Sequence, residues 1–295
     1  MKRLLWILLP PVLVVVARMH VEWVWFSQFN WQSVLFQRWM LQLLFAGIGS
    51  IPVALAVLWL RAFDRIDDPP RQQMRPIEGV RFSLVLLLSG LAFLACSVVL
   101  TDLAILAWKQ PFSLSHWHES SHSMASEWKA MLPVQLAIAG VSLCRPQWRR
   151  WLAIAMGFAL LLVVSRAWGV WSLAWLIPDE GLREPLLDTD LSFGLGRFSA
   201  LRLGLELLVL SGTFTTAHAL WGRLTVAPHL SDWSMPALGT RSYRWLSIGV
   251  GTNLIGVAGL VWLSRHQLLW HQHGLVAGAG WLQHHLTLPF RSLLA

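Results

Sequence analysis

The sequence predicts an all-α fold: a polytopic transmembrane helical bundle of about seven spans, with the N-terminus in the cytoplasm. Hydrophobic residues make up 56% of the 295-residue chain and charged residues only 13%, and the mean hydropathy is +0.55. Seven apolar segments approach the roughly 20 residues that a helix needs to cross a bilayer. Short arginine-bearing loops separate most of them. Residues 1–295 are therefore expected to form a single transmembrane domain.

The expected spans are residues 4–21, 40–60, 82–107, 126–144, 151–170, 201–221 and 245–263. The first follows two basic residues, as a secretory signal would. It contains Pro10 and Pro11 and no small-x-small cleavage site follows it, so we expect it to remain as a span. Pro146 should end the fourth helix, because proline breaks a helix interior. The fourth and fifth spans are therefore expected to form a tight hairpin.

The seventh expected span is rich in small residues. Ser247 and Gly251, and Thr252 and Gly256, form small-xxx-small pairs, which let neighbouring helices approach closely. Asn253 lies among them and is expected to form an interhelical hydrogen bond. This pattern favours a packing role for the span.

The charges outside the spans favour one orientation. With the N-terminus inside, the inner segments carry thirteen Lys and Arg residues against five Asp and Glu, whereas the outer segments carry eight against nine. Basic residues concentrate in loops that stay cytoplasmic. The excess positive charge is therefore expected to face anionic lipid headgroups, and the pattern argues against nucleic-acid binding.

Three segments carry motifs that together are more specific than any one alone. Residues 22–36 read EWVWFSQFNWQSVLF, residues 184–198 read EPLLDTDLSFGLGRF, and a third segment begins WLSRHQLL at Trp262. In this order and at these places they resemble the uncharacterised bacterial membrane family UPF0182. The matching positions are Trp25, Phe26, Glu184, Pro185, Asp190, Ser192, Phe193, Arg265, Gly278 and Pro289.

The resemblance implies a multi-pass protein of the bacterial inner membrane. Members of the family are typically about three times as long as this chain, so it is expected to be the N-terminal membrane part of a longer protein with a large extracytoplasmic region. Residues 286–295 look like the start of an eighth span. Because the family has no established activity, the resemblance implies topology and no mechanism.

The sixth expected span carries the strongest candidate for intramembrane chemistry. Glu206 lies inside it, and intramembrane acids are costly unless they are paired or hydrated. Arg202 precedes it by four residues on the same helical face, and His218 follows near the other end. One interpretation is a proton- or ion-conducting helix in which Glu206 titrates. The other, which we favour, is an Arg202–Glu206 ion pair at the outer interface.

Histidines offer a weaker metal-binding candidate. His116, His118 and His122 form an HxHxxxH pattern in an expected outer loop, and imidazole is a suitable ligand for zinc or copper. No cysteine accompanies them and no HExxH motif is present, so solvated loop histidines are the favoured interpretation. No catalytic residue, metal or cofactor is expected.

Three classes of function remain open at this point. We expect a non-enzymatic membrane anchor or scaffold for an extracytoplasmic domain or partner. The alternatives are an ion- or proton-linked transporter or channel that uses the polar sixth span, and an outer-face metal-dependent enzyme. The expected partners are the lipid bilayer and other membrane or extracytoplasmic proteins.

Overall fold

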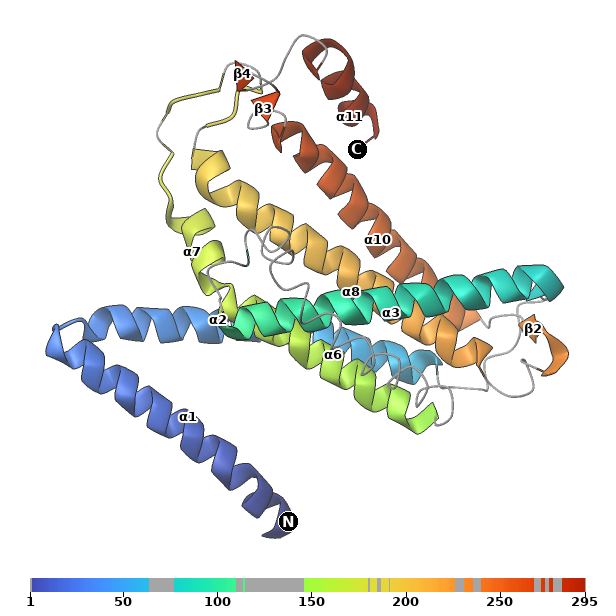
Figure 1. The fold of residues 1–295 in the computed structure, drawn as a ribbon, viewed down its shortest axis with the longest axis horizontal. Helices are drawn as coiled ribbons and strands as arrows, with labels where there is room; N and C mark the ends of the chain where they lie inside the picture. Colours follow the sequence, from blue (N-terminus) through green and yellow to red (C-terminus); the bar gives the residue numbers. More distant parts are fainter. Residues whose placement is uncertain are drawn as a thin grey trace.

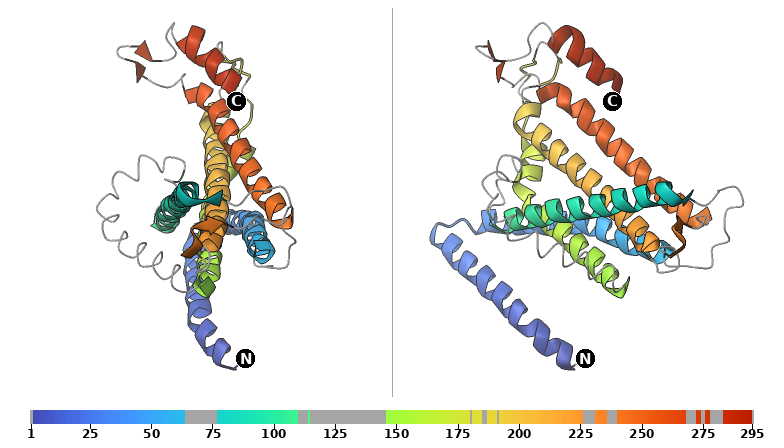
Figure 2. Two further views of the ribbon diagram at one scale, coloured as in Figure 1. Left: turned by 90° about the vertical axis from the view of Figure 1, so that its right-hand side faces the viewer. Right: turned by 45° about the vertical axis from the view of Figure 1, so that its right-hand side comes forward.

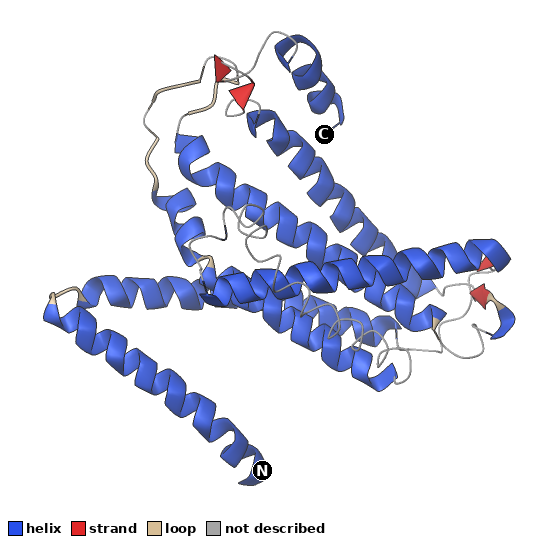
Figure 3. Ribbon diagram, in the orientation of Figure 1, coloured by secondary structure: helices blue, strands red, loops and turns tan. Residues whose placement is uncertain are grey.

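The computed structural model is almost entirely helical (Figures 1 and 3). It describes residues 2–63, 77–109, 114, 146–179, 181–184, 187–190, 192–225, 231–235, 240–267, 272–273, 276–277 and 283–294. Helices cover six of the seven expected spans. The fourth, residues 126–144, lies outside the described residues.

Six long helices dominate the structure. They are α1 (Lys2–Gln28), α2 (Gln32–Phe63), α3 (Gly79–Lys109), α6 (Pro146–Arg166), α8 (Phe198–Leu224) and α10 (Thr240–Gln267). The shorter helical elements are α7 (Trp168–Leu176), η2 (Phe193–Arg197), η3 (Gln283–Thr287) and α11 (Leu288–Leu294). Two-residue strands form two antiparallel pairs, β1 (Ile77–Glu78) with β2 (Ser234–Met235) and β3 (Gln272–His273) with β4 (Val276–Ala277).

The apolar core lies where α3, α6 and α8 meet. Its buried side chains include Phe93 and Leu100 of α3, Leu160 of α6, and Leu207 and Phe214 of α8. In Figure 2, α3 lies on one side of the row formed by α6 and α8, and α2 and α10 lie on the other side. The helix α1 extends away from the bundle and packs against α2 near the turn that joins them (Figure 1).

Glycines allow two helix pairs to pack closely. Gly49 of α2 faces Leu161 and Val164 of α6, and a Cβ added at Gly49 would lie 3.2 Å from either side chain. Gly256 and Gly259 of α10 receive side chains from α8 in the same way. Removing a side chain at a helix contact lets the two backbones approach, which is the usual packing device between membrane helices.

Several helices begin or end beside the short strands β1 and β2 (Figure 1). One end holds the start of α3, the end of α8 and the start of α10, joined by the β1–β2 pair. There Gly79 N donates a hydrogen bond to Trp233 O, and the Phe82 and Trp233 rings meet edge to face. In Figure 1 the α1–α2 turn lies at the far left, whereas the start of α8 and the end of α10 lie at the top.

The expectation of about seven spans is wrong for the part of the chain that the structure describes. Three helices there are long and apolar enough to cross a membrane, over Gln32–Ile51, Gly79–Lys109 and Leu246–Gln267. A fourth is possible if Trp151–Arg166 and Trp168–Leu176, which are bent by 45° at the break between them, form one span. The fifth expected span is therefore a broken helix. The sixth expected span, in α8, is not among these helices, because an ion pair and several hydroxyl groups lower its hydropathy.

At the turn that joins them, the first two helices extend further than the apolar runs predicted. The apolar runs stop at residue 21 and resume at residue 40, but α1 continues to Gln28 and α2 begins at Gln32. A tight turn joins them, with Asn30 in the left-handed region at φ 57°. Asparagine tolerates this conformation better than most residues. Backbone hydrogen bonding extended both helices into their polar flanks, which a hydropathy boundary cannot detect.

Large apolar side chains cover the outer faces of the bundle. Leu43 of α2, Leu87 and Leu88 of α3, and Leu254 and Ile255 of α10 are between 58% and 69% exposed. Large apolar side chains exposed on several helices indicate an apolar environment or a partner. The described faces are consistent with membrane association.

Candidate functional site

Asp190 organises the second motif segment. Its Oδ1 accepts a hydrogen bond from Ser192 N and its Oδ2 accepts one from Gly181 N, both at 2.8 Å. Gly181 has φ 73°, a conformation that glycine adopts without steric cost. The two bonds close the loop between α7 and η2, because the Asp190 carboxylate holds the backbone of Gly181, nine residues earlier in the sequence.

A second carboxylate connects the same loop to the start of α8. Asp179 Oδ1 lies 2.8 Å from Arg197 Nη2, and it also accepts a hydrogen bond from Ser192 Oγ at 3.2 Å. The Ser192 side chain is fully buried. The carboxylate and the guanidinium therefore neutralise each other while the serine hydroxyl is satisfied.

Glu184 closes a smaller turn in the middle of the segment. Its Oε2 accepts a hydrogen bond from Leu187 N at 2.7 Å, and its backbone N donates to Thr189 O at 2.8 Å. Arg183 pairs with Asp188 on the surface at 3.0 Å. The neighbouring motif residue Pro185 lies outside the described residues.

The third motif segment packs on the second through aromatic rings. His266 is 2% exposed and its ring lies 4.7 Å from that of Phe193 and 5.2 Å from that of Trp262, between centroids. Phe198 also contacts it, at 6.5 Å. The guanidinium of Arg265 lies 4.8 Å above the Trp262 ring, within the range of a cation–π interaction.

The α11 helix completes this assembly. Arg265 Nη1 donates to Ser292 Oγ at 3.1 Å, and Arg291 Nη1 donates to Ser264 O. Pro289 is the second residue of α11, which follows η3 directly. We call residues 177–198, 262–267 and 288–294 the motif cap, because they unite the second and third motif segments at one end of the bundle.

The α8 candidates do not form one site. Arg202 Nε donates to Glu206 Oε1 at 3.0 Å, and the two side chains are 31% and 13% exposed. His218 lies about 18 Å further along the helix at 1.5 Å per residue, buried between Phe93 and Phe214 with ring centroids at 5.7 Å. The structure therefore contains the expected ion pair, and His218 belongs to the aromatic core.

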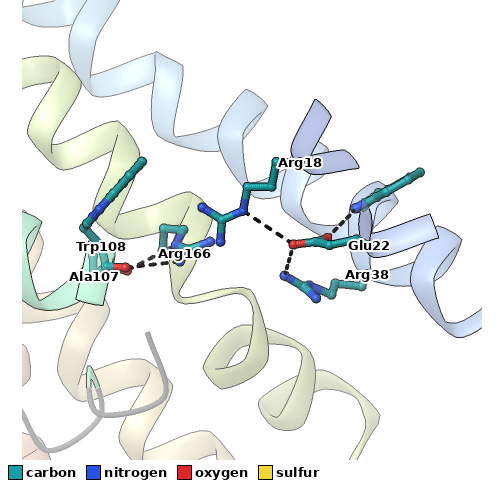
Figure 4. Close-up of polar contacts among 7 residues, drawn as sticks. Arg18, Glu22, Arg38, Ala107, Trp108 and Arg166 are labelled. Carbon is teal, nitrogen blue, oxygen red and sulfur yellow. Dashed lines mark hydrogen bonds and ion pairs between the residues drawn. The ribbon is translucent and has the colours of Figure 1, made fainter. Parts of the chain in front are cut away.

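Sequence reasoning missed a charged cluster between α1, α2 and α6 (Figure 4). Glu22 Oε1 forms ion pairs with Arg18 at 3.6 Å and with Arg38 at 3.5 Å, and Trp39 Nε1 donates a hydrogen bond to Glu22 Oε2 at 3.4 Å. Nearby, Arg166 donates to the carbonyl oxygens that end α3. The i, i+4 spacing of Arg18 and Glu22 was a visible signal for part of this cluster.

Of the remaining expected positions, Trp25 and Phe26 lie among the described residues. Trp25 is 52% exposed and packs edge to face on Phe26 at 5.0 Å. The histidine candidates His116, His118 and His122, and the motif residue Gly278, lie outside the described residues. Among the residues with described positions, no group of three or more His, Cys, Asp or Glu is arranged to hold a metal ion.

These features define a helical-bundle protein with membrane-compatible helices and a polar cap built from its motif segments. A family model described as an uncharacterised protein family, UPF0182, matches residues 3–295. The chain therefore belongs to the UPF0182 family, as its motifs predicted.

Similar proteins come from strains of Synechococcus and Prochlorococcus. A UPF0182 protein of Synechococcus sp. strain CC9902 is 90% identical over 295 residues, which is 100% of this chain and 32% of that protein. One from Synechococcus sp. strain CC9605 is 44% identical over 99% of this chain and 32% of its own length. One from Prochlorococcus marinus strain MIT 9303 is 38% identical over 98% of this chain and 31% of its own length. The chain spans about a third of the length of these relatives. No solved structure matches it.

Proposed function

We propose that this chain is the membrane-embedded part of a larger UPF0182 protein, and that it anchors or scaffolds an extracytoplasmic domain or partner without catalysing a reaction. Two observations support the larger protein and the membrane setting. The chain accounts for 32% of its 90% identical relative. Three or four of its described helices are apolar enough to cross a membrane, and their outer faces carry exposed leucines.

The observation that carries the proposal is how the polar groups of the motif cap are used. Asp190 and Glu184 accept backbone hydrogen bonds, Asp179 pairs with Arg197, and Arg265 bonds α11. A catalytic site keeps reactive groups available to substrate. Groups that satisfy one another instead make a rigid cap, which is what a mounting surface for a following domain needs.

We further propose that the protein is a multi-pass protein of the bacterial inner membrane with its N-terminus in the cytoplasm. The basic bias of the inner segments supports this orientation. It would place the β1–β2 end in the cytoplasm and the motif cap outside, on the side where the family's extracytoplasmic region is expected.

A second candidate function is ion- or proton-linked transport, which one observation favours. Asp102 of α3 and His218 of α8 are 9% and 4% exposed, and Glu206 is 13% exposed. Buried titratable groups inside a membrane bundle are typical of proton relays. The Arg202 partner of Glu206 weighs against this candidate, because the Glu206 carboxylate already accepts a hydrogen bond from Arg202 Nε at 3.0 Å.

Complementation of a deletion strain distinguishes the two candidates. The whole natural protein would be restored as wild type or with Asp102→Asn, Glu206→Gln or His218→Ala, at protein levels matched by immunoblot. The anchor proposal expects each variant to restore whatever growth trait the deletion loses, and to stay in membranes after alkaline carbonate extraction. If Glu206→Gln fails to restore growth although its level in the membrane is normal, the result would support transport. If carbonate releases the wild-type protein from the membrane, the result would contradict both candidates.

A further inference from the structure

Three arginines from three different helices gather beside the α1–α2 turn, and we propose that they bind a tetrahedral oxyanion. The residues are Arg18 of α1, Arg38 of α2 and Arg166 at the end of α6. In Figure 4 the guanidinium groups of Arg18 and Arg38 contact Glu22, and that of Arg166 lies between Arg18 and the carbonyl oxygens that end α3. The ligand would be a phosphate group, either carried by a lipid headgroup or free in solution. This site is independent of the anchoring role.

The charge of the cluster is unbalanced. Glu22 is the one acid among the described residues that forms ion pairs with these arginines, at 3.6 Å from Arg18 and 3.5 Å from Arg38. The contacts of Arg166 go to the carbonyl oxygens of Ala107 and Trp108, at 3.1 and 3.3 Å, and carry no negative charge. Three cations therefore face one anion. The charges of Arg18 and Arg38 lie close enough to act on Arg166.

The arginines of the cluster also have N–H groups that no close acceptor in the described part of the chain occupies. The Arg38 Nε atom is buried and has no hydrogen-bond partner among the described residues, although buried N–H groups are nearly always paired. The ion-pair distances to Glu22 are longer than the usual 2.7–2.9 Å of a charge-assisted hydrogen bond. Guanidinium groups present a planar fork that matches two oxygens of a phosphate. An oxyanion between the arginines would supply both the missing charge and the missing acceptor.

The location suits a ligand that arrives from the headgroup region. The Arg18 side chain is 56% exposed and that of Arg38 is 26% exposed, so the cluster is open on one side. Trp23 and Trp31, on either side of the turn, are 44% and 54% exposed. Exposed tryptophans on membrane helices concentrate at headgroup depth. A phosphate of a lipid would lie at the same depth.

Two measurements on the whole natural protein separate the possible sources of the oxyanion. The first reconstitutes it in nanodiscs of phosphatidylcholine with added phosphatidylglycerol, and quantifies the lipids that stay bound by native mass spectrometry. The second measures the thermal unfolding midpoint in detergent with and without inorganic phosphate. Selective retention of phosphatidylglycerol alone assigns the site to a lipid headgroup, and stabilisation by phosphate alone assigns it to a free anion. If the protein neither retains phosphatidylglycerol selectively nor is stabilised by inorganic phosphate, the proposal is overturned.

Two variants with opposite expected effects test whether this cluster is responsible. Arg38→Gln removes a charged donor and is expected to weaken retention of the responding ligand by about tenfold. Glu22→Gln removes the competing carboxylate and is expected to strengthen retention several-fold. Arg183→Gln serves as the control, because it removes an exposed arginine in the motif cap. Equal retention by Glu22→Gln and wild type would overturn the proposal even if Arg38→Gln failed to fold.

Discussion

Glu206 and Arg202 neutralise each other within about one turn of α8, and this pairing decides how each residue should behave. The side chains are 13% and 31% exposed, so the pair is neither sealed nor fully solvated. A pair with this access to water or headgroups contributes little, since desolvation and attraction nearly cancel. The sequence indicated this pair from the four-residue spacing alone, because it lies within one helix.

Replacing Glu206 with Gln is therefore expected to change the free energy of unfolding by only about 0–1 kcal/mol. The amide keeps an oxygen that can accept the Arg202 hydrogen bond. Thermal unfolding in detergent, followed by circular dichroism, measures the change. A drop of several kcal/mol would show instead that the charge of Glu206 itself stabilises the bundle.

Asp190 behaves differently, because both carboxylate oxygens are in use. Asp190→Asn keeps one acceptor and turns the other into a donor facing a backbone N–H of Gly181 or Ser192. We expect a loss of about 1–3 kcal/mol locally and faster protease cleavage within residues 177–192. Asp188→Asn is the matched control, since its partner Arg183 lies on the surface. Equal cleavage rates in the two variants would contradict the capping role.

At the scale of helices, the small residues of α10 divide into those that pack and those that do not. A Cβ at Gly256 would lie 2.6 Å from Val209 Cγ2, whereas a Cβ at Gly251 would meet nothing within 4 Å. Thr213 Oγ1 donates to Asn253 Oδ1 at 2.9 Å, which confirms the expected interhelical bond. The pattern of small residues predicted close packing, but spacing alone could not choose the face.

Gly256→Ala is therefore expected to destabilise the α8–α10 pair by about 1–3 kcal/mol, because Val209 is β-branched and stiff. Gly251→Ala is the control and should be neutral or slightly stabilising, since alanine favours the helix. Unfolding midpoints of the two variants in one detergent provide the comparison. Loss of stability in Gly251→Ala alone would reverse the assignment of the packing face.

At the scale of the whole molecule, hydropathy located helices better than it defined spans. It placed a helix at each expected segment that the structure describes, because long apolar runs are also good helix formers. It could not foresee the 45° break that divides the fifth segment into α6 and α7. Nor could it foresee the Glu22 cluster, which depends on α1, α2 and α6 meeting in space. The motif cap was predictable only as separate segments, since no sequence pattern shows that Phe193 packs on His266.

The anchoring role requires the two ends of the bundle to lie on opposite sides of a membrane. Single cysteines at Ser33 and Leu182, in a background with Cys96 and Cys144 replaced by alanine, test one end, and cysteines at Glu78 and Ser231 test the other. All four positions are exposed in the structure. An impermeant maleimide added to intact cells with a permeabilised outer envelope should label residues 33 and 182 but not 78 and 231 until the inner membrane is opened. Labelling of 78 and 231 in place of 33 and 182, or equal labelling of all four, would contradict this topology.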